Sequence, residues 1–296
     1  MDLIDKISGF AEKNGFFAGI TGGGPIKKNP GDKKIPFVKF SVNERNEPRL
    51  TMPGCKSVII IGLGYRKKYS FADDGLPRGI LSQGAVGIDY HVLVREKLES
   101  LKNHLSGFVN FSCKIFADTG PLDEKALLVK AGMGFLGVNG LVFNKKHGSF
   151  FNAGYMMTDL DMPVKNRTVK PECGDCRLCV KTCPGGAIME NAFDYTRCVS
   201  YITQKSGLLS DSEKRIMGTN LYGCDVCQDV CPLNKHVPAA EITDIESAMP
   251  ALARIINLSK PEFHERYKDT ALYWRGLNIL KRNARIANDN INKGGE

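Results

Sequence analysis

Apolar residues in the first half of the chain recur at two spacings, one typical of helices and one of strands. Near the start they form a helical face that is followed by the stop signal Asn14-Gly15. Apolar positions about 3.6 residues apart predict a second helix over residues 88–105, and a third is expected over residues 123–131, where Gly132 ends it. Short apolar runs predict strands over residues 16–20, 58–63 and 114–117.

A glycine-rich passage follows the third predicted helix. After it, residues 141–143 and 149–151 have the pattern of two strands on either side of the turn-forming residues 145–148. We therefore expect a hairpin here, with His147 exposed at its tip.

Composition narrows the class of protein. The chain has 296 residues, of which 42% are hydrophobic and 25% charged, so it should form one or two globular domains. The longest apolar run, residues 58–61, is too short to cross a bilayer, and the start lacks the pattern of a signal peptide, so we expect a cytoplasmic protein. The net charge of +9 suits a polyanionic partner such as RNA, although a basic enzyme without such a partner would look the same.

Eight of the ten cysteines lie between Cys173 and Cys231, in two copies of a cluster motif. The first copy is C-x2-C-x2-C-x3-C-P, the ferredoxin run for a 4Fe–4S cluster, and the second has its first cysteine displaced upstream by an insertion. In two-cluster ferredoxins the fourth cysteine of each run binds the other cluster. The predicted ligands are therefore Cys173, Cys176, Cys179 and Cys231 for one cluster and Cys183, Cys198, Cys224 and Cys227 for the other.

Other interpretations of the cysteines are weaker. Structural zinc would favour separated C-x2-C pairs over a C-x2-C-x2-C triple with two Cys-Pro steps. Cys55 and Cys113 lie outside the motif and are expected to be inert buried thiols. Clusters alone carry electrons, and more than half of the chain precedes them, so an enzyme is favoured over a bare electron carrier.

The order of short motifs across nearly the whole chain resembles the epoxyqueuosine reductase family. The motifs begin with Asp89-Tyr90-His91 and continue with Ala117-Asp118-Thr119-Gly120-Pro121, Lys125-Ala126, Ala131-Gly132, Gly134, Gly137 and Asn139. The other matching strings are Ser149-Phe150-Phe151, Thr158-Asp159-Leu160, Arg197-Cys198-Val199-Ser200-Tyr201, Tyr222-Gly223-Cys224-Asp225, Arg275-Gly276, Leu280-Lys281-Arg282-Asn283 and Ile286-Ala287.

This resemblance implies an α+β fold in three parts: a cobalamin-binding front domain similar to that of reductive dehalogenases (residues 1–165), a ferredoxin-like domain with two 4Fe–4S clusters (166–238) and a short basic helical tail (239–296). It implies reduction of the epoxide of epoxyqueuosine in the anticodon loop of tRNA. It also implies an external electron donor, such as a flavodoxin or ferredoxin, and a monomeric protein.

By the same resemblance, Asp118 is the proton donor. From the residues alone, an aspartate before x-Gly-Pro could equally form a turn or cap the next helix. The expected cobalamin contacts are His91, Gly132, Gly134, Gly137 and Asn139, although the glycines could merely shape a turn and His91 could be an ordinary helix residue.

The tail alternates basic and aromatic residues, which suits phosphate contacts and base stacking in an unpaired RNA loop. An amphipathic helix whose aromatics pack inward is the alternative. The residues are Arg266, Lys268, Arg275, Lys281, Arg282 and Arg285, with Tyr267, Tyr273 and Trp274 between them.

Four positions depart from the family pattern: Val138 replaces a Lys, Gly140 a Thr or Ser, Tyr155 a Glu, and Leu233 a Trp. A paralogue acting on a different epoxide, a halide or a corrinoid therefore stays open. So do a ferredoxin-like electron-transfer protein and a corrinoid reductase that feeds a partner enzyme.

Overall fold

The computed structural model describes residues 2–27, 37–71, 74–164, 168–190 and 192–294. Contacts divide the chain into two compact units that interleave along the sequence. The first contains residues 1–64, 91–137 and 141–174, and the second contains residues 65–90, 138–140 and 175–296. The functional division at residues 165 and 238 stays a prediction, because it follows the chain whereas these contacts join distant segments.

The first unit is built on a four-stranded antiparallel sheet with the order β1-β2-β8-β5. Its strands are β1 (Phe17–Gly22), β2 (Ser57–Gly64), β8 (Phe151–Thr158) and β5 (Cys113–Ala117). The strands predicted from residues 16–20, 58–63 and 114–117 are confirmed.

Burial on both faces explains the unbroken apolar run of β2. Because side chains alternate along a strand, Ile59 and Ile61 join a core cluster that includes Leu98 and Leu101. Val58 and Ile60 face the other way, into a cluster with helix α5 and strand β8. A strand covered on both sides has no polar face, so it reads as continuous hydrophobic sequence.

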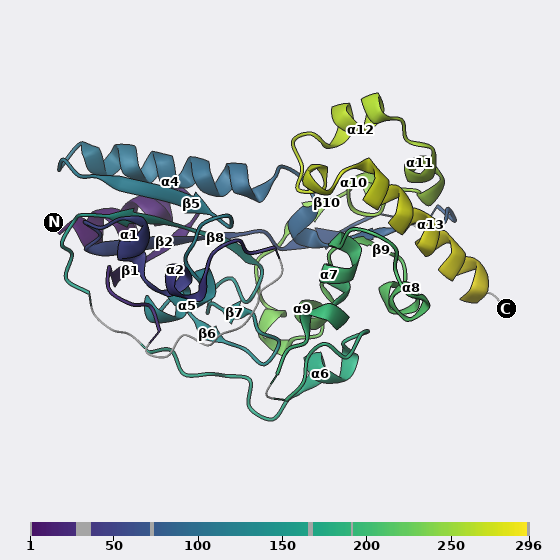
Figure 1. The fold of residues 1–296 in the computed structure, drawn as a ribbon, viewed down its shortest axis with the longest axis horizontal. Coiled ribbons are helices and arrows are strands. Elements are labelled where there is room, and N and C mark those ends of the chain that lie inside the picture. Colours follow the sequence, from purple (N-terminus) through teal and green to yellow (C-terminus); the bar gives the residue numbers. More distant parts are fainter. Residues whose placement is uncertain (1, 28–36, 72–73, 165–167, 191, 295–296) are drawn as a thin grey trace. The chain divides into compact units, whose positions relative to one another are not determined.

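Helices cover both faces of this sheet. Helix α1 (Leu3–Lys13) and the long helix α4 (Tyr90–Ser106) bury their apolar stripes in one cluster, and α5 (Glu124–Lys130) packs on the other. Figure 1 shows α4 as the long blue helix of this part of the chain. All three helices agree with the predicted positions. Two short helices, α2 (Val42–Asn46) and α3 (Pro48–Thr51), precede β2.

The predicted hairpin over residues 141–151 is wrong. Strand β7 (Val142–Phe143) pairs instead with β6 (Phe135–Leu136), while β8 joins the main sheet. Only an isolated bridge between Asn144 and Gly148 closes the expected turn. The strand predicted at residues 141–143 matches β7, whereas the one predicted at 149–151 overlaps β8 only at Phe151, and the partners of both strands are set by distant segments.

The second unit combines short elements around a helical core. Two parallel strand pairs, β10 with β3 and β4 with β9, each join segments far apart in the chain. The strands are β3 (Lys67–Tyr69), β4 (Ile80–Leu81), β9 (Asn220–Tyr222) and β10 (Ala240–Ile242). The helices are α6 (Leu178–Thr182), α7 (Val199–Gln204), α8 (Asp211–Met217), α9 (Val226–Asp229), α10 (Ile245–Ala248), α11 (Leu252–Asn257), α12 (Lys260–Tyr267) and α13 (Leu277–Gly294), with 3-10 turns η1 (Gln83–Ala85), η2 (Tyr195–Arg197), η3 (Pro232–Asn234) and η4 (Tyr273–Arg275).

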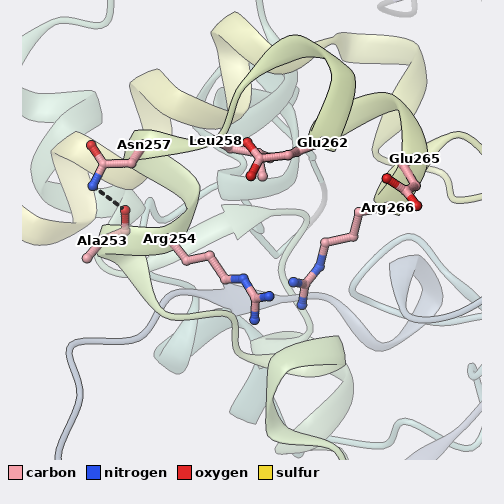
Figure 2. Close-up of a pocket in the computed structure, with 7 residues that line it drawn as sticks. All are labelled: Ala253, Arg254, Asn257, Leu258, Glu262, Glu265 and Arg266. Carbon is pink, nitrogen blue, oxygen red and sulfur yellow. Dashed lines mark hydrogen bonds between the residues drawn. The ribbon is translucent and has the colours of Figure 1, made fainter.

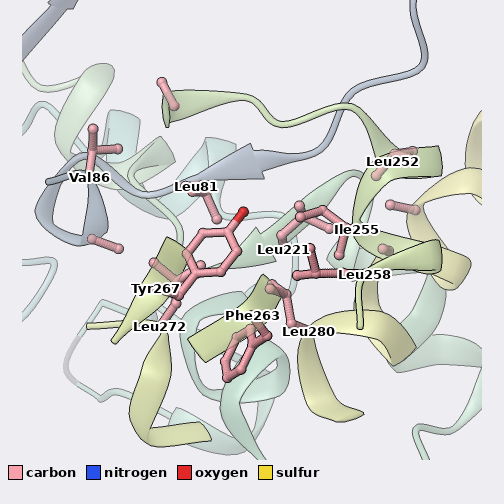
Figure 3. Close-up of a cluster of buried hydrophobic side chains, with 14 residues drawn as sticks. Leu81, Val86, Leu221, Leu252, Ile255, Leu258, Phe263, Tyr267, Leu272 and Leu280 are labelled. Atoms are coloured by element: carbon pink, nitrogen blue, oxygen red, sulfur yellow. The ribbon is translucent and has the colours of Figure 1, made fainter. Parts of the chain in front are cut away.

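The core of this unit gathers side chains from strands β4 and β9 and from the last helices (Figure 3). Helix α13 packs against α11 and β9. Its buried Asn283 donates to the carbonyl oxygens of Thr203 (2.7 Å) and Leu221 (2.8 Å), which ties the tail to α7 and β9. Among the described residues, no helix is both long and apolar enough to cross a membrane.

Candidate active site

Asp118 occupies a strained turn at the end of edge strand β5. Its φ angle is 59°, a left-handed conformation that residues other than glycine rarely adopt. The N–H of Thr119 donates to the carbonyl oxygen of Ala117 across 2.6 Å, so Asp118 is the central residue of a γ-turn with positive φ. Such strain persists only where the surroundings impose it, and it is concentrated at functional sites.

His91, in the first turn of α4, meets this turn. Its Nε2 atom lies 3.2 Å from the Oδ2 atom of Asp118, so a proton on this nitrogen is shared with the carboxylate. The Asp118 side chain is 53% exposed and that of His91 is 32% exposed. Both side chains are thus accessible to a ligand. The sequence predicts different roles for Asp118 and His91, and the structure places them together.

Glu124, which the sequence analysis missed, is the third member of this group. Its Oε1 atom accepts the backbone N–H of Asp118 across 2.9 Å. Burial raises the pKa of Glu124 to about 8, and the nearby negative charge of Asp118 adds to the effect. The helix cap is Asp123, whose side chain accepts the N–H of Ala126. Asp118 is therefore not the cap that the alternative interpretation suggested.

Tyr155 fixes the other end of the Asp118 loop. Its hydroxyl accepts the backbone N–H of Leu122 across 2.9 Å, and its side chain is fully buried. A Cβ atom added to Gly120 would lie 2.2 Å from this hydroxyl, so only glycine fits at that point of the loop. The departure at position 155 therefore places a phenol directly against the loop.

Local packing supplies structural reasons for the predicted glycines. Gly132 follows α5 with φ of 68°, and a Cβ atom on Gly134 would lie 2.2 Å from the carbonyl oxygen of Phe143. The N–H of Gly137 donates to the carbonyl oxygen of Leu141 across 2.8 Å. These contacts build the β6–β7 hairpin, and a contact between these glycines and a corrin ring stays a prediction.

Packing also places Asn139, which is a predicted cobalamin contact, and His147, which was expected at the hairpin tip. Asn139 is buried in the second unit, where its Nδ2 atom donates to the carbonyl oxygen of Cys227 across 3.5 Å. His147 is half-buried and stacks on Phe17 with 4.8 Å between ring centroids, so its predicted exposure at a hairpin tip is wrong.

The predicted ligands of the second cluster gather in one place. Burial raises the pKa of the Cys224 thiol to about 11 and that of Cys227 to about 12, and the nearby Cys183 and Cys198 sulfurs add to both shifts. Thiolates are thus unfavourable here until metal replaces their protons. The N–H of Ala187 also donates to the sulfur of Cys183 across 3.2 Å, a contact typical of cluster sulfurs.

The predicted ligands of the first cluster are divided between the units. Cys173 belongs to the first unit, and Cys176, Cys179 and Cys231 belong to the second, where α6 packs against α9. Within the described parts of the chain, no three His, Cys, Asp or Glu side chains converge as ligands of a single metal ion.

Cys55 and Cys113 agree with the expectation of inert thiols. Cys55 is buried and Cys113 is partly buried in β5. Burial raises the pKa of both thiols, which disfavours the reactive thiolate.

Some residues of the basic tail pack inward, as the amphipathic-helix interpretation predicts, and others are exposed, as the RNA-binding interpretation predicts. Tyr267 is buried in the core, and Arg282 donates to the carbonyl oxygens of Lys205 and Gly207, so both serve packing. Trp274, in contrast, is 54% exposed. Its Nε1 atom donates to the Tyr222 hydroxyl across 2.6 Å, and the Arg275 guanidinium lies 3.6 Å from its ring centroid.

The second unit also has a pocket of about 510 Å³ between α11 and α12, lined by Ala253, Arg254, Asn257, Leu258, Glu262, Glu265 and Arg266. The guanidinium groups of Arg254 and Arg266 point into the same space (Figure 2). Both lie within 3.5 Å of one Glu246 carboxylate oxygen. The pocket contains none of the residues predicted for cobalamin or the clusters.

The chain is similar to known protein families and to curated proteins. Residues 45–119 match the family model "Epoxyqueuosine reductase QueG, DUF1730", and residues 172–234 match "4Fe-4S double cluster binding domain". A Staphylococcus aureus epoxyqueuosine reductase is 33% identical over 265 residues, which are 87% of this chain and 70% of that protein.

Solved structures extend the similarity to the fold. An epoxyqueuosine reductase with an epoxyqueuosine-modified tRNA-Tyr stem loop superposes with a TM-score of 0.90 at 30% identity, over 97% of this chain and 81% of that one. The Bacillus subtilis epoxyqueuosine reductase, with its aspartate-bearing catalytic loop swung out of the active site, gives 0.86 at 29%, with the same coverage of both chains.

A reductive dehalogenase shares the fold at a greater distance, with a TM-score of 0.51 and 17% identity over 94% of this chain and 37% of that one. The mixed α+β architecture and the double-cluster domain are thus those of known proteins. At 33% identity over 70% of a curated relative, the chain belongs to the epoxyqueuosine reductase family.

Proposed function

We propose that this protein reduces the epoxide of epoxyqueuosine in tRNA to the alkene of queuosine, with Asp118 as proton donor. The reaction consumes two electrons and two protons, and the epoxide oxygen leaves as water. The observation that carries the proposal is the strained, accessible Asp118 turn paired with His91, in a chain whose family and fold match epoxyqueuosine reductases.

The cysteine arrangement supports two 4Fe–4S clusters as the resident electron carriers. Cys183, Cys198, Cys224 and Cys227 are partly buried thiols near one another, and such a donor set gains its thiolate form when it binds iron. Crossed ligation would place Cys183 on the same cluster as Cys198, Cys224 and Cys227. An external one-electron donor, such as a flavodoxin or ferredoxin, would then reduce the clusters.

A cobalamin bound by the front unit is the cofactor that the family resemblance implies, and the dehalogenase likeness supports only the fold of that unit. In this unit, we propose that His91 and the glycine-rich β6–β7 hairpin contact the cobalamin. When bound, cobalamin supplies the electrons that break the epoxide C–O bond.

Asp118 and His91 have complementary parts in the proton transfer. The exposed carboxyl group of Asp118 delivers a proton to the departing oxygen, a role in which a positioned acid contributes typically 10²–10⁴-fold. His91 Nε2, 3.2 Å from that carboxylate, is placed to return a proton to it before the next turnover.

The tRNA-binding surface would include η4. Trp274 presents an exposed ring backed by the Arg275 guanidinium, and Tyr273 beside it is 39% exposed. An aromatic face for stacking with a cation for phosphate is the combination that binds unpaired RNA loops.

A component-omission assay tests this function. Anaerobically reconstituted protein should convert epoxyqueuosine in a tRNA stem loop only when cobalamin and a low-potential reductant are both present. Unchanged corrin absorption bands during titration of the protein with cobalamin, together with no conversion, would favour an electron-transfer protein instead.

A further inference from the structure

The backbone of the Asp118 turn is held by the side chain of Glu124. Glu124 lies at the first position of α5, and its Oε1 atom accepts the Asp118 N–H across 2.9 Å. This is the backbone donor of the very residue whose φ angle is 59°. The acceptor therefore acts on the strained residue itself.

We propose that Glu124 is the positioning residue for Asp118: it fixes the strained turn that presents the Asp118 carboxyl group beside His91. The inference rests on the proposed function, in which Asp118 delivers the proton. Glu124 acts through the Asp118 backbone and makes no contact with substrate in this role.

The charges around Glu124 differ from those around Asp123, and this difference explains why a carboxyl group at Glu124 can serve as the acceptor for the Asp118 N–H. Asp123, the neighbouring residue, has its charge balanced by Lys27 and Arg45. Around Glu124, the charges that act on it are those of Asp118, Asp123 and His91. Burial and the two carboxylates favour the neutral form, and a neutral carboxyl oxygen still accepts an N–H while adding no repulsion to Asp118.

Tyr155 restricts the same loop at its other end, through the Leu122 N–H. The loop thus has two attachment points, and the one made by Glu124 is to the backbone of Asp118 itself. In the Bacillus subtilis relative the corresponding type of loop was found swung out of the active site. The Glu124 contact would oppose a movement of this kind by the Asp118 loop of this chain.

Three variants of Glu124 distinguish the effect of its hydrogen-bond acceptor from the effect of its charge. Glu124→Gln keeps a neutral oxygen acceptor, Glu124→Leu removes the acceptor at similar size, and Glu124→Asp keeps a carboxylate one methylene too short to reach. We expect Glu124→Gln to keep kcat within about twofold, and the Leu and Asp variants to lose about tenfold or more in kcat with KM nearly unchanged. Asp123→Asn, the matched loss of charge one residue away, should keep its kcat.

Hydrogen exchange measured by mass spectrometry gives a readout independent of activity. The peptide containing the Asp118 amide should exchange slowly in the wild-type protein and Glu124→Gln, and faster in Glu124→Asp and Glu124→Leu. Exchange that is equally slow in all four proteins would overturn the inference. Equal kcat losses in the Gln and Leu variants would overturn it as well.

These outcomes are distinct from failure of the proposed function. If wild-type protein does not reduce epoxyqueuosine, that function is wrong, while the exchange data still decide whether Glu124 holds the turn. If wild-type protein is active and Glu124→Asp retains full kcat, the function stands and the positioning role of Glu124 is wrong. Thermal midpoints and iron content, measured for every variant, identify any protein that has not folded.

Discussion

The imidazole of His91 lies 3.2 Å from the carboxylate of Asp118, although the two residues are 27 positions apart in the sequence. Helix α4 supplies one and the end of strand β5 supplies the other. The packing of α4 against the sheet therefore brings the two side chains together, and we propose that this pair transfers the proton in the reaction.

Replacing Asp118 with asparagine should lower kcat by about 10²–10⁴-fold, because the amide cannot deliver a proton to the departing oxygen. Cobalamin binding and iron content should stay at wild-type values. Asp161→Asn, at an exposed position outside the site, is the matched control. Single-turnover rates on the tRNA stem loop would measure the effect, and a wild-type rate in Asp118→Asn would remove Asp118 from the mechanism.

The Glu124 carboxyl group should make stability depend on pH. The unfolded chain loses this proton near pH 4.5, whereas the folded protein keeps it to about pH 8. Between these values the folded state binds more protons, so the stabilisation present at low pH is lost as pH rises through about 8. Glu124→Gln does not titrate, so its thermal midpoint relative to wild type should rise between about pH 5 and about pH 8.

Asp123→Asn is the control for that pH series. The ion pair with Lys27 holds the pKa of Asp123 below its usual value of 3.8, so its stabilisation is lost only as pH falls below this range. Its midpoint difference from wild type should stay flat over the interval in which that of Glu124→Gln changes. A flat difference for Glu124→Gln would show that Glu124 is ionised in the folded protein at neutral pH.

Double cysteine variants test the crossed ligation of the clusters. Cys183 and Cys224 are predicted to bind the same cluster, so Cys183→Ser with Cys224→Ser should retain about four irons per chain. Cys179→Ser with Cys183→Ser should remove both clusters, because each residue serves a different one. Cys113→Ser should keep about eight irons. Iron and sulfide assays on anaerobic protein measure this, and equal losses in the two double variants would contradict the assignment.

Trp274→Ala should weaken binding of the tRNA stem loop by about 1–3 kcal/mol through the loss of one stacking platform. Trp274→Phe should recover most of this energy, since it keeps an aromatic face. Leu208→Ala, at a side chain that is 92% exposed, is the control for loss of apolar surface. Fluorescence anisotropy at a fixed salt concentration is the measurement. Equal affinities for wild type and Trp274→Ala would exclude this residue from the RNA interface.

Local sequence pattern was sufficient wherever an element is determined by its own residues. Strand β2 could be predicted because both faces are buried, and α4 because its apolar residues repeat at helical spacing. The pairing of β7 with β6, and of β8 with β2 and β5, could not be predicted, because register and partner are set by distant segments.

The candidate site also contains one residue that the local sequence predicts and one whose role depends on the fold. Asp118 was predicted from a motif that surrounds it in the sequence, whereas the role of Glu124 depends on a turn that brings its side chain back under the Asp118 amide. A signal was nevertheless present: two acidic residues begin α5, and only Asp123 is needed as its cap. An acidic residue that lies at the start of a helix but does not cap it is a candidate for another role.

The most direct test of the account is the mass of the modified nucleoside. Epoxyqueuosine-containing tRNA would be incubated anaerobically with the reconstituted protein, cobalamin and a chemical reductant, then digested and analysed by mass spectrometry. The account predicts a nucleoside lighter by one oxygen atom, formed by wild-type protein and not by Asp118→Asn. An unchanged nucleoside, from protein shown to contain both clusters and bound cobalamin, would contradict it.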